Sequence, residues 1–281
     1  YGAQDIYLTG NPQITFFKVV YRRHTNFSME CIQQTINGSN KISATATSTG
    51  NVTVSRNGDL VHKVYVRTDQ DGVEGVSGDH LISQVECEIG GQLIDRHYEE
   101  WLQVWAELST PASKTDGYKY LTGGFSNTLV AGSGTSQQSV MVPLQFWFCR
   151  NPGLALPLIA LQYHEVKIKL TWGATGGSES PIVYCDYIYL DTDERRRFAQ
   201  VSHEYLIEQV QYDTVAASQT SHTLNFNHPV KELVLTGAWA SGAFAALDGS
   251  LATTLTLKLN GHERFAPRPL SYFTTAQVWQ H

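Results

Sequence analysis

The chain has 281 residues, of which 42% are hydrophobic and 11% aromatic, and it carries 20 Lys plus Arg against 26 Asp plus Glu. This apolar fraction is enough to build a core and excludes a disordered chain. The net charge of -6 argues against a protein whose main function is to coat nucleic acid, because such binding depends on positive charge. The longest apolar stretch, residues 154–161, is far shorter than the roughly 20 residues that cross a bilayer, so no transmembrane segment is expected.

Most of the chain is predicted to form β-strands, because apolar and polar residues alternate with a period of two. Glycine, serine, threonine and asparagine clusters separate these stretches, as expected for turns between strands. The pattern therefore predicts an all-β fold. The candidate strands lie at 64–66, 85–89, 166–171, 182–190, 205–210, 224–226, 233–235 and 255–259.

One segment, residues 96–108, has a helical period instead. Trp101, Trp105 and Leu108 recur at i, i+4 and i+7, which predicts a short amphipathic helix whose aromatic stripe packs on the core. The segments 114–124 and 131–138 are rich in Gly, Ser and Thr. They are interpreted as long exposed loops, either functional or tolerated surface insertions.

A short internal repeat indicates a duplicated β-domain. The strings Glu-Ile-Gly-Gly-Gln at 88–92 and Lys-Leu-Asn-Gly-His at 258–262 both place a tight glycine turn directly after an alternating strand. The glycines Gly91 and Gly261 are 170 residues apart. If the two copies are similar in size, the second copy is expected to continue beyond residue 281.

Three acids and three arginines lie together between the two copies, in residues 191–198. Arg195, Arg196 and Arg197 could contact phosphate, but the adjacent carboxylates cancel their charge. The favoured interpretation is a linker held by local or intersubunit ion pairs.

No catalytic or cofactor motif is present. The chain has no phosphate-binding loop, no dinucleotide fingerprint, no nucleophile elbow and no metal-binding histidine motif. Adjacent His and Glu pairs include those that begin at His164 and His203; if they lie on strands, their side chains point to opposite faces and cannot share an ion. We therefore expect no enzyme activity, no cofactor and no metal site.

The four cysteines, Cys31, Cys87, Cys149 and Cys185, contain no C-x-x-C pair. Reduced thiols are the favoured interpretation, with a disulfide as the alternative. Three sequons, at Asn26, Asn37 and Asn51, are candidate glycosylation sites, although such triplets also arise by chance.

Several long strings resemble the major capsid protein of large icosahedral DNA viruses, with the chlorella virus type most similar. They occur in collinear order along the whole chain. The main ones are Tyr-Gly-Ala-Gln-Asp-Ile-Tyr-Leu-Thr-Gly-Asn-Pro-Gln-Ile-Thr-Phe-Phe-Lys at 1–18, Pro-Gly-Leu-Ala-Leu-Pro-Leu-Ile-Ala-Leu-Gln-Tyr-His-Glu-Val at 152–166, His-Glu-Tyr-Leu-Ile-Glu-Gln at 203–209, and Leu-Asn-Phe-Asn-His-Pro at 224–229.

The resemblance implies a tandem double jelly roll, two antiparallel β-sandwiches in one chain, of which the second is incomplete here. It implies an N-terminal arm at 1–24, a first roll at 25–190, a linker at 191–203 and the start of the second roll at 204–281. Three chains would form a homotrimer with a pseudo-hexagonal outline, and these capsomers would tile an icosahedral shell.

The same resemblance implies a virion protein that is assembled in the cytoplasm of the infected cell. Its partners would be neighbouring capsomers and minor capsid proteins beneath the shell, with no direct contact to nucleic acid. The residues expected to pack in the core or between subunits are Trp101, Trp105, Phe146, Trp147, Phe148 and Tyr163.

The alternative from another functional class is a jelly-roll carbohydrate-binding protein. Tyr118 and Tyr120 are in a segment rich in Gly and Thr, and aromatic rings in a loop can stack on sugars.

Overall fold

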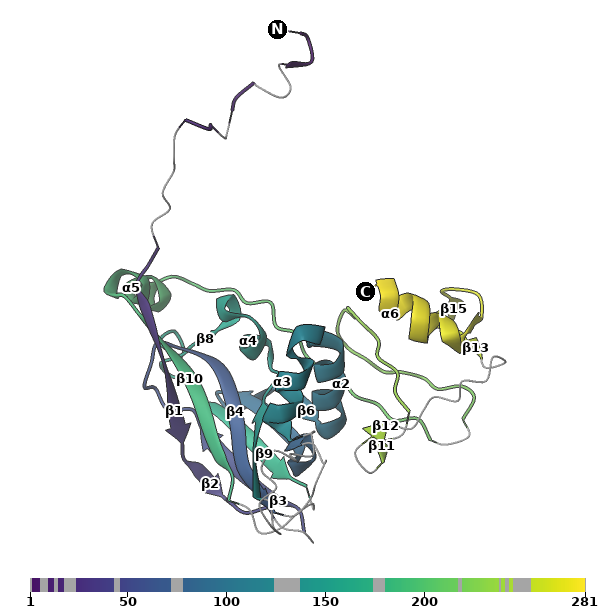
Figure 1. Cartoon of the computed structure of the whole chain (residues 1–281), viewed down its shortest axis with the longest axis horizontal. Helices are drawn as coiled ribbons and strands as arrows, with labels where there is room; N and C mark the ends of the chain where they lie inside the picture. The colour runs from purple at the N-terminus through teal and green to yellow at the C-terminus, as the bar shows by residue number, and fades with distance from the viewer. Residues whose placement is uncertain are drawn as a thin grey trace.

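A sandwich of two antiparallel sheets forms the centre of the molecule (Figure 1). The computed structural model describes residues 2–5, 10–12, 15–17, 24–42, 46–71, 78–123, 137–173, 180–216, 219–237, 239–240, 243–244 and 254–280. The first sheet has the strand order β1 (Phe27–Gln34), β10 (Ile182–Leu190), β4 (Leu60–Asp71) and β7 (Gln137–Pro143), with the short β8 (Leu156–Pro157) also paired to β4.

The second sheet lies against the first and shares its core. The chain passes repeatedly from one sheet to the other between consecutive strands or strand pairs, a connectivity typical of a jelly roll. Its strand order is β2 (Ile36–Gly38), β3 (Ser48–Thr53), β9 (Val166–Trp172), β5 (Ile82–Ile89) and β6 (Gln92–Tyr98).

Apolar side chains from alternate positions of the strands fill the space between the two sheets. Along β9, Val166, Ile168, Leu170 and Trp172 are buried, whereas the residues between them are only half-buried. Because successive side chains of a strand point to opposite faces, one face of each strand joins the core. The predicted strands at 64–66, 85–89, 166–171 and 182–190 are confirmed as parts of β4, β5, β9 and β10.

The hairpin between β5 and β6 turns through two glycines in the left-handed region, Gly90 with φ of 61° and Gly91 with φ of 82°. The same turn recurs between β14 (Lys258–Leu259) and β15 (His262–Glu263), where Asn260 has φ of 51° and Gly261 has φ of 81°. Two central residues with positive φ define the tight turn that favours Asn-Gly and Gly-Gly, so both members of the sequence repeat form the same local structure.

Helices lie at several places around the sandwich (Figure 1). The predicted helix within 96–108 is confirmed as α2 (Glu99–Ser109), but the predicted stripe is wrong, because α2 buries Leu102, Val104 and Ala106 while Leu108 is exposed. The expectation of a loop at 114–124 is wrong, because α3 (Ala112–Thr122) occupies it; Pro111 precedes this helix and Gly123 ends it, and these are ordinary helix boundary signals. Of the predicted loop at 131–138, residues 131–136 lie outside the described residues, and residues 137 and 138 begin β7 instead. The shorter helices are η1 (Gly78–Leu81), α4 (Trp147–Arg150), η3 (Pro152–Leu154) and α5 (Thr192–Gln200).

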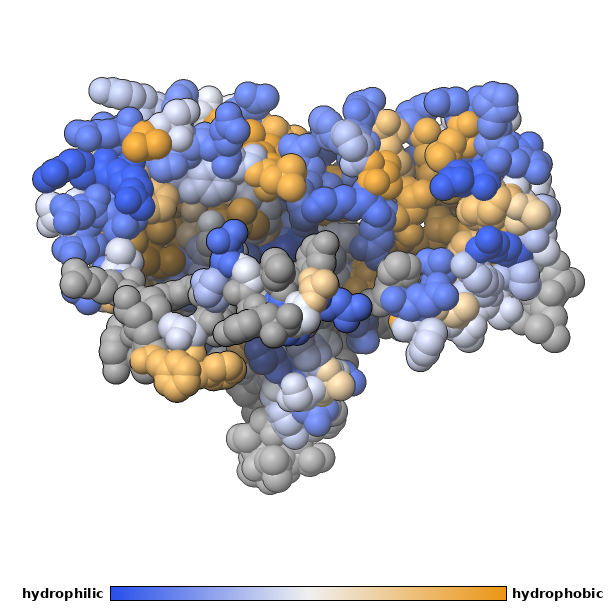
Figure 2. Space-filling model, turned by 90° about the horizontal axis from the view of Figure 1, so that it is seen from above, coloured by the Kyte–Doolittle hydropathy of each residue, from blue (hydrophilic) through white to orange (hydrophobic). Residues whose placement is uncertain are grey.

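The chain after α5 differs from the sandwich. Residues 201–237 are not assigned to strands wherever they are described, so the expectation of strands at 205–210, 224–226 and 233–235 is wrong for the part of the chain that the structure describes. Apolar surface lies open over this C-terminal part, on the right of Figure 2. Its remaining elements are β11 (Trp239–Ala240), β12 (Ala243–Phe244), β13 (Thr254–Leu255), β16 (Arg268–Pro269), the π-helical η4 (Tyr272–Ala276) and α6 (Gln277–Gln280). In the part of the chain that the structure describes, no helix is long and apolar enough to span a membrane.

Core packing yields a direct test on two of the aromatic residues identified in the sequence. Phe146 is fully buried, and Phe146→Ala is expected to lower the free energy of unfolding by about 3–5 kcal/mol through lost contacts and a cavity. Tyr163 is 92% exposed, and Tyr163→Ala is expected to change it by less than about 0.5 kcal/mol. Chemical denaturation of both variants measures the difference; equal stabilities would contradict this packing.

Candidate assembly surfaces

Three of the aromatic residues identified in the sequence lie inside the sandwich. Phe146, Trp147 and Phe148 are at most 2% exposed, at and just before the start of α4. The rings of Phe146 and Phe148 stack at 5.8 Å, and Trp147 meets Phe148 edge to face at 5.1 Å. This cluster belongs to the core rather than to a surface.

The other three aromatic residues lie further out. Trp101 and Trp105 are half-buried on α2 and stack on each other at 5.7 Å. The guanidinium of Arg150 lies 3.9 Å from the centre of the Trp105 ring. Tyr163 projects into solvent from the turn before β9, so among these six residues it has the most surface available for a partner.

All three sequon asparagines are exposed. Asn26 immediately precedes β1, whereas Asn37 and Asn51 are directly opposite each other in the β2–β3 pair. Directly opposed residues have Cβ atoms roughly 5 Å apart, so two glycans at these positions would compete for the same space.

Helix α5 is fastened to the sandwich by Asp59, whose side chain is 9% exposed. Its carboxylate accepts a hydrogen bond from the Leu190 backbone N–H at 2.8 Å, and the Arg195 guanidinium binds it at 3.0 and 3.1 Å. A second, more exposed pair joins Arg197 to Glu194 at 3.5 Å within the helix. The ion pairs expected for residues 191–198 are therefore present, one within α5 and one from α5 to Asp59.

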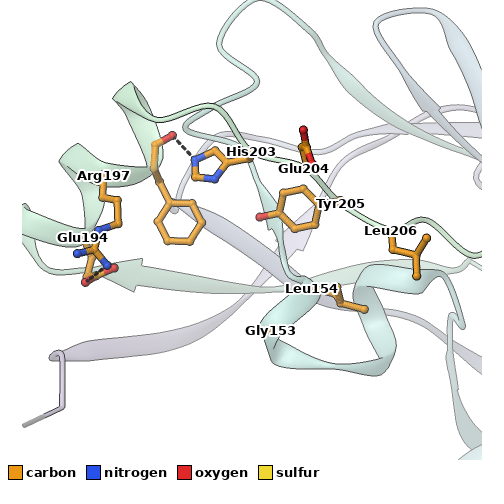
Figure 3. A pocket seen from close by; sticks show the side chains of 9 residues that line it. Gly153, Leu154, Glu194, Arg197, His203, Glu204, Tyr205 and Leu206 are labelled. Atoms are coloured by element: carbon orange, nitrogen blue, oxygen red, sulfur yellow. Dashed lines mark hydrogen bonds and ion pairs between the residues drawn. The ribbon is translucent and has the colours of Figure 1, made fainter.

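An open cavity of about 400 Å³ lies between α5, η3 and residues 203–206 (Figure 3). The His203 ring stacks on Phe198 at 5.0 Å, and His203 Nε2 lies 2.9 Å from the Phe198 carbonyl oxygen. Glu204 follows on an irregular segment, not on a strand, and the pair at His164 also lies outside any strand. The argument from strand geometry was therefore wrong for both pairs; in the described residues no group of three or more His, Cys, Asp or Glu side chains could hold a metal ion.

The sequence alone did not indicate the buried pair of Asp95 and His97. Both point into the sandwich from β6, with Asp95 Oδ2 at 2.8 Å from His97 Nε2, and the His97 ring stacks on Phe146 at 4.7 Å. Their i, i+2 spacing in a β-strand could have suggested a shared face. The sequence pattern at 96–108 predicts a helix that includes His97, and in a helix residues i and i+2 do not share a face.

The outer face of the second sheet carries charged side chains, several of which form ion pairs with one another. Arg96 Nε lies 2.6 Å from Glu86 Oε1, and Lys169 forms an ion pair with Glu88 across neighbouring strands. Such cross-strand pairs stabilise a hydrated face modestly. A partner on this face would have to replace contacts that already exist.

Comparison with known proteins identifies the family. A family model described as the N-terminus of the major capsid protein matches residues 15–191, and one described as the major capsid protein of large eukaryotic DNA viruses matches residues 194–246. The major capsid protein of Pyramimonas orientalis virus is 54% identical over the whole chain, which spans 74% of that relative. The chain belongs to the major capsid proteins of large DNA viruses.

A relative from Paramecium bursaria Chlorella virus 1 and a solved capsid structure agree with this assignment. The chlorella virus protein is 41% identical, with all of this chain and 76% of the relative aligned. A chain of the PBCV-1 virus capsid superposes with a TM-score of 0.75 at 36% identity, covering 95% of this chain and 77% of that one. The resemblance in the sequence is confirmed, and the major capsid protein is a structural, non-enzymatic component of the icosahedral virion shell.

All four cysteines of the capsid protein are free thiols, and Cys31 alone is exposed. Partial burial raises the pKa of the Cys31 thiol to about 11, and the Asp186 carboxylate adds to this by accepting its S–H and by its charge. Burial also raises the pKa of the Cys149 thiol to about 12. These thiols therefore stay protonated near neutral pH.

This environment predicts slow alkylation of Cys31 despite its exposure. At pH 8 the rate with iodoacetamide is expected to be roughly tenfold below that of the same cysteine in denatured protein, and to rise as the pH approaches about 11, because the thiolate is the reacting form. Asp186→Asn is expected to speed the reaction. Mass spectrometry of the Cys31 peptide provides the rates, and alkylation at the denatured rate at pH 8 would contradict the assignment.

Proposed function

We propose that the capsid protein is a tandem double jelly roll whose second roll is only partly contained in this chain. Residues 25–190 form the first roll, 191–203 the linker and 204–281 the beginning of the second roll, with 1–24 as an N-terminal arm. The observation that carries the proposal is the turn of β5–β6, which recurs 170 residues later in β14–β15 with positive φ at both central residues.

Three chains then form one capsomer. Two similar sandwiches per chain produce six similar bodies around a threefold axis, which explains a pseudo-hexagonal outline without six separate chains. Capsomers pack side by side through smaller polar contacts, while minor capsid proteins bind beneath the shell. The likeness to a chain of the PBCV-1 virus capsid supports this arrangement.

The aromatic residues divide between two roles in this proposal. Phe146, Trp147 and Phe148 hold the first roll together from within. Trp101 and Trp105 support the surface where α2 meets the rest of the chain, and Tyr163 contributes to contacts between subunits. The exposed sequons at Asn26, Asn37 and Asn51 are proposed as glycan sites, with at most one of the directly opposed Asn37 and Asn51 occupied in a given chain.

The alternative of sugar binding depended on aromatic side chains in a flexible, glycine-rich loop. Tyr118 and Tyr120 lie instead within the helix α3. The specific feature that suggested this alternative is therefore absent at these two positions.

The oligomeric state of the full-length protein tests the proposal. Light scattering after size exclusion is expected to show three times the subunit mass. Tyr163→Ala is expected to weaken the trimer without unfolding the subunit, because Tyr163 is 92% exposed and contributes little to the core. A stable monomer of the wild-type protein at micromolar concentration would overturn the proposed capsomer.

A further inference from the structure

The free edge of the second sheet is crossed by residues 204–212, which we call the strap. In Figure 1 the chain runs from α5 across the sandwich towards α2. The Gln209 side-chain amide donates a hydrogen bond to the Ile94 carbonyl oxygen, and the Val210 backbone N–H donates one to Asp95 Oδ1 at 3.0 Å. The strap is thus attached to β6 by side chains rather than by a strand ladder.

An aromatic contact continues this attachment towards α2. The Tyr212 ring lies 4.9 Å from the Tyr98 ring, at an interplanar angle of 39°. Tyr98 is the last residue of β6, so the strap follows this edge over several residues. An open strand edge invites pairing with another chain, and a covering segment removes that hazard.

Arg150 holds the strap from the side of the first sandwich. Its Nη1 lies 2.9 Å from Glu208 Oε2, and its Nε donates a hydrogen bond to the Gln145 carbonyl oxygen at 3.0 Å. The face of the guanidinium lies against Trp105. Because a guanidinium is planar and its donors point in fixed directions, these two contacts within the first sandwich determine where Glu208 binds.

Glu208 also binds a residue that follows the strap in the sequence, Lys231. Lys231 forms an ion pair with its other carboxylate oxygen, and together with Arg150 it lowers the pKa of Glu208. Glu208 is therefore ionised at neutral pH, and its contacts are lost only as the pH falls through this lowered pKa. One carboxylate thus links a cation of the first sandwich to a cation in the chain that follows the strap.

We propose that Arg150 is a positioning residue for capsid assembly: through Glu208 it fixes the strap on the edge of β6 and so sets the orientation of the second roll relative to the first. This inference rests on the proposed tandem arrangement. In a capsomer of six similar bodies, an error in the angle between two rolls is repeated three times. A single half-buried ion pair at the junction is therefore suited to define the capsomer outline.

Hydrogen exchange of the full-length protein, followed by mass spectrometry, tests the strap directly. Glu208→Gln removes the charge from the strap side without changing the first sandwich. It is expected to raise exchange roughly tenfold in peptides that contain Val210, whose backbone N–H is bonded to Asp95, because a charge-assisted bond is lost and the strap opens more often. Arg150→Met is expected to raise exchange in the same peptides.

The matched control is Glu204→Gln, because Glu204 lies on the strap and forms no ion pair with any residue that the structure describes. It is expected to leave exchange at the wild-type level. Light scattering of the same samples is expected to show less trimer for Glu208→Gln and Arg150→Met only, and Arg150→Lys is expected to restore it incompletely.

Two results would overturn the inference. One is a hydrogen-exchange rate in Glu208→Gln that equals the wild-type rate. The other is faster exchange in Glu208→Gln together with an unchanged fraction of trimer. Failure of the proposed function is a different result. In that case the wild-type protein is monomeric, while Glu208→Gln still exposes the strap to exchange.

Discussion

Burial of two apolar sheet faces against each other is the constraint on which the rest of this structure depends. Neither sheet could exist alone in water, because alternation along β9 and β10 leaves each with one apolar face. Covering these faces fixes the sheet spacing and the strand register. A one-residue slip would turn every buried side chain outward.

Polar groups at the margins of this core then attach the flanking segments. Asp59 binds α5 through Arg195, and Asp95 receives the strap through the Val210 N–H. Asp59 and Asp95 are both almost completely buried, so each carboxylate is held in one position. Helix α5 and the strap are therefore fastened to the sandwich at defined points.

Local periodicity explains which parts of the fold could be predicted. The strands at 85–89 and 166–171 follow from alternation alone, and the two hairpins follow from Gly-Gly and Asn-Gly turns, whose conformational preferences are local. The helix α3 was missed because its glycine and threonine content resembles that of a loop. Segments such as 205–210 have the alternation of a strand, but a strand requires a neighbour, and no local pattern shows whether the neighbour is there.

The residues of the junction could not be predicted for the same reason. Arg150 and Glu208 are 58 residues apart in sequence, and nothing near either residue distinguishes it from other surface charges. The aromatic run at 146–148 was correctly noticed, yet its place in the core, in contrast to the exposure of Tyr163, depends on the packing of α4. Family resemblance identified the function, whereas the contacts between Arg150 and Glu208 required the three-dimensional structure.

The central claim is that one chain supplies two of the six bodies of a capsomer. A density map of the assembled shell, at a resolution that separates strands and traces the linker, tests it most directly. The account predicts three chains per capsomer, each with two sandwiches joined through α5 and with the strap lying along β6. Six separate chains with one sandwich each would contradict it.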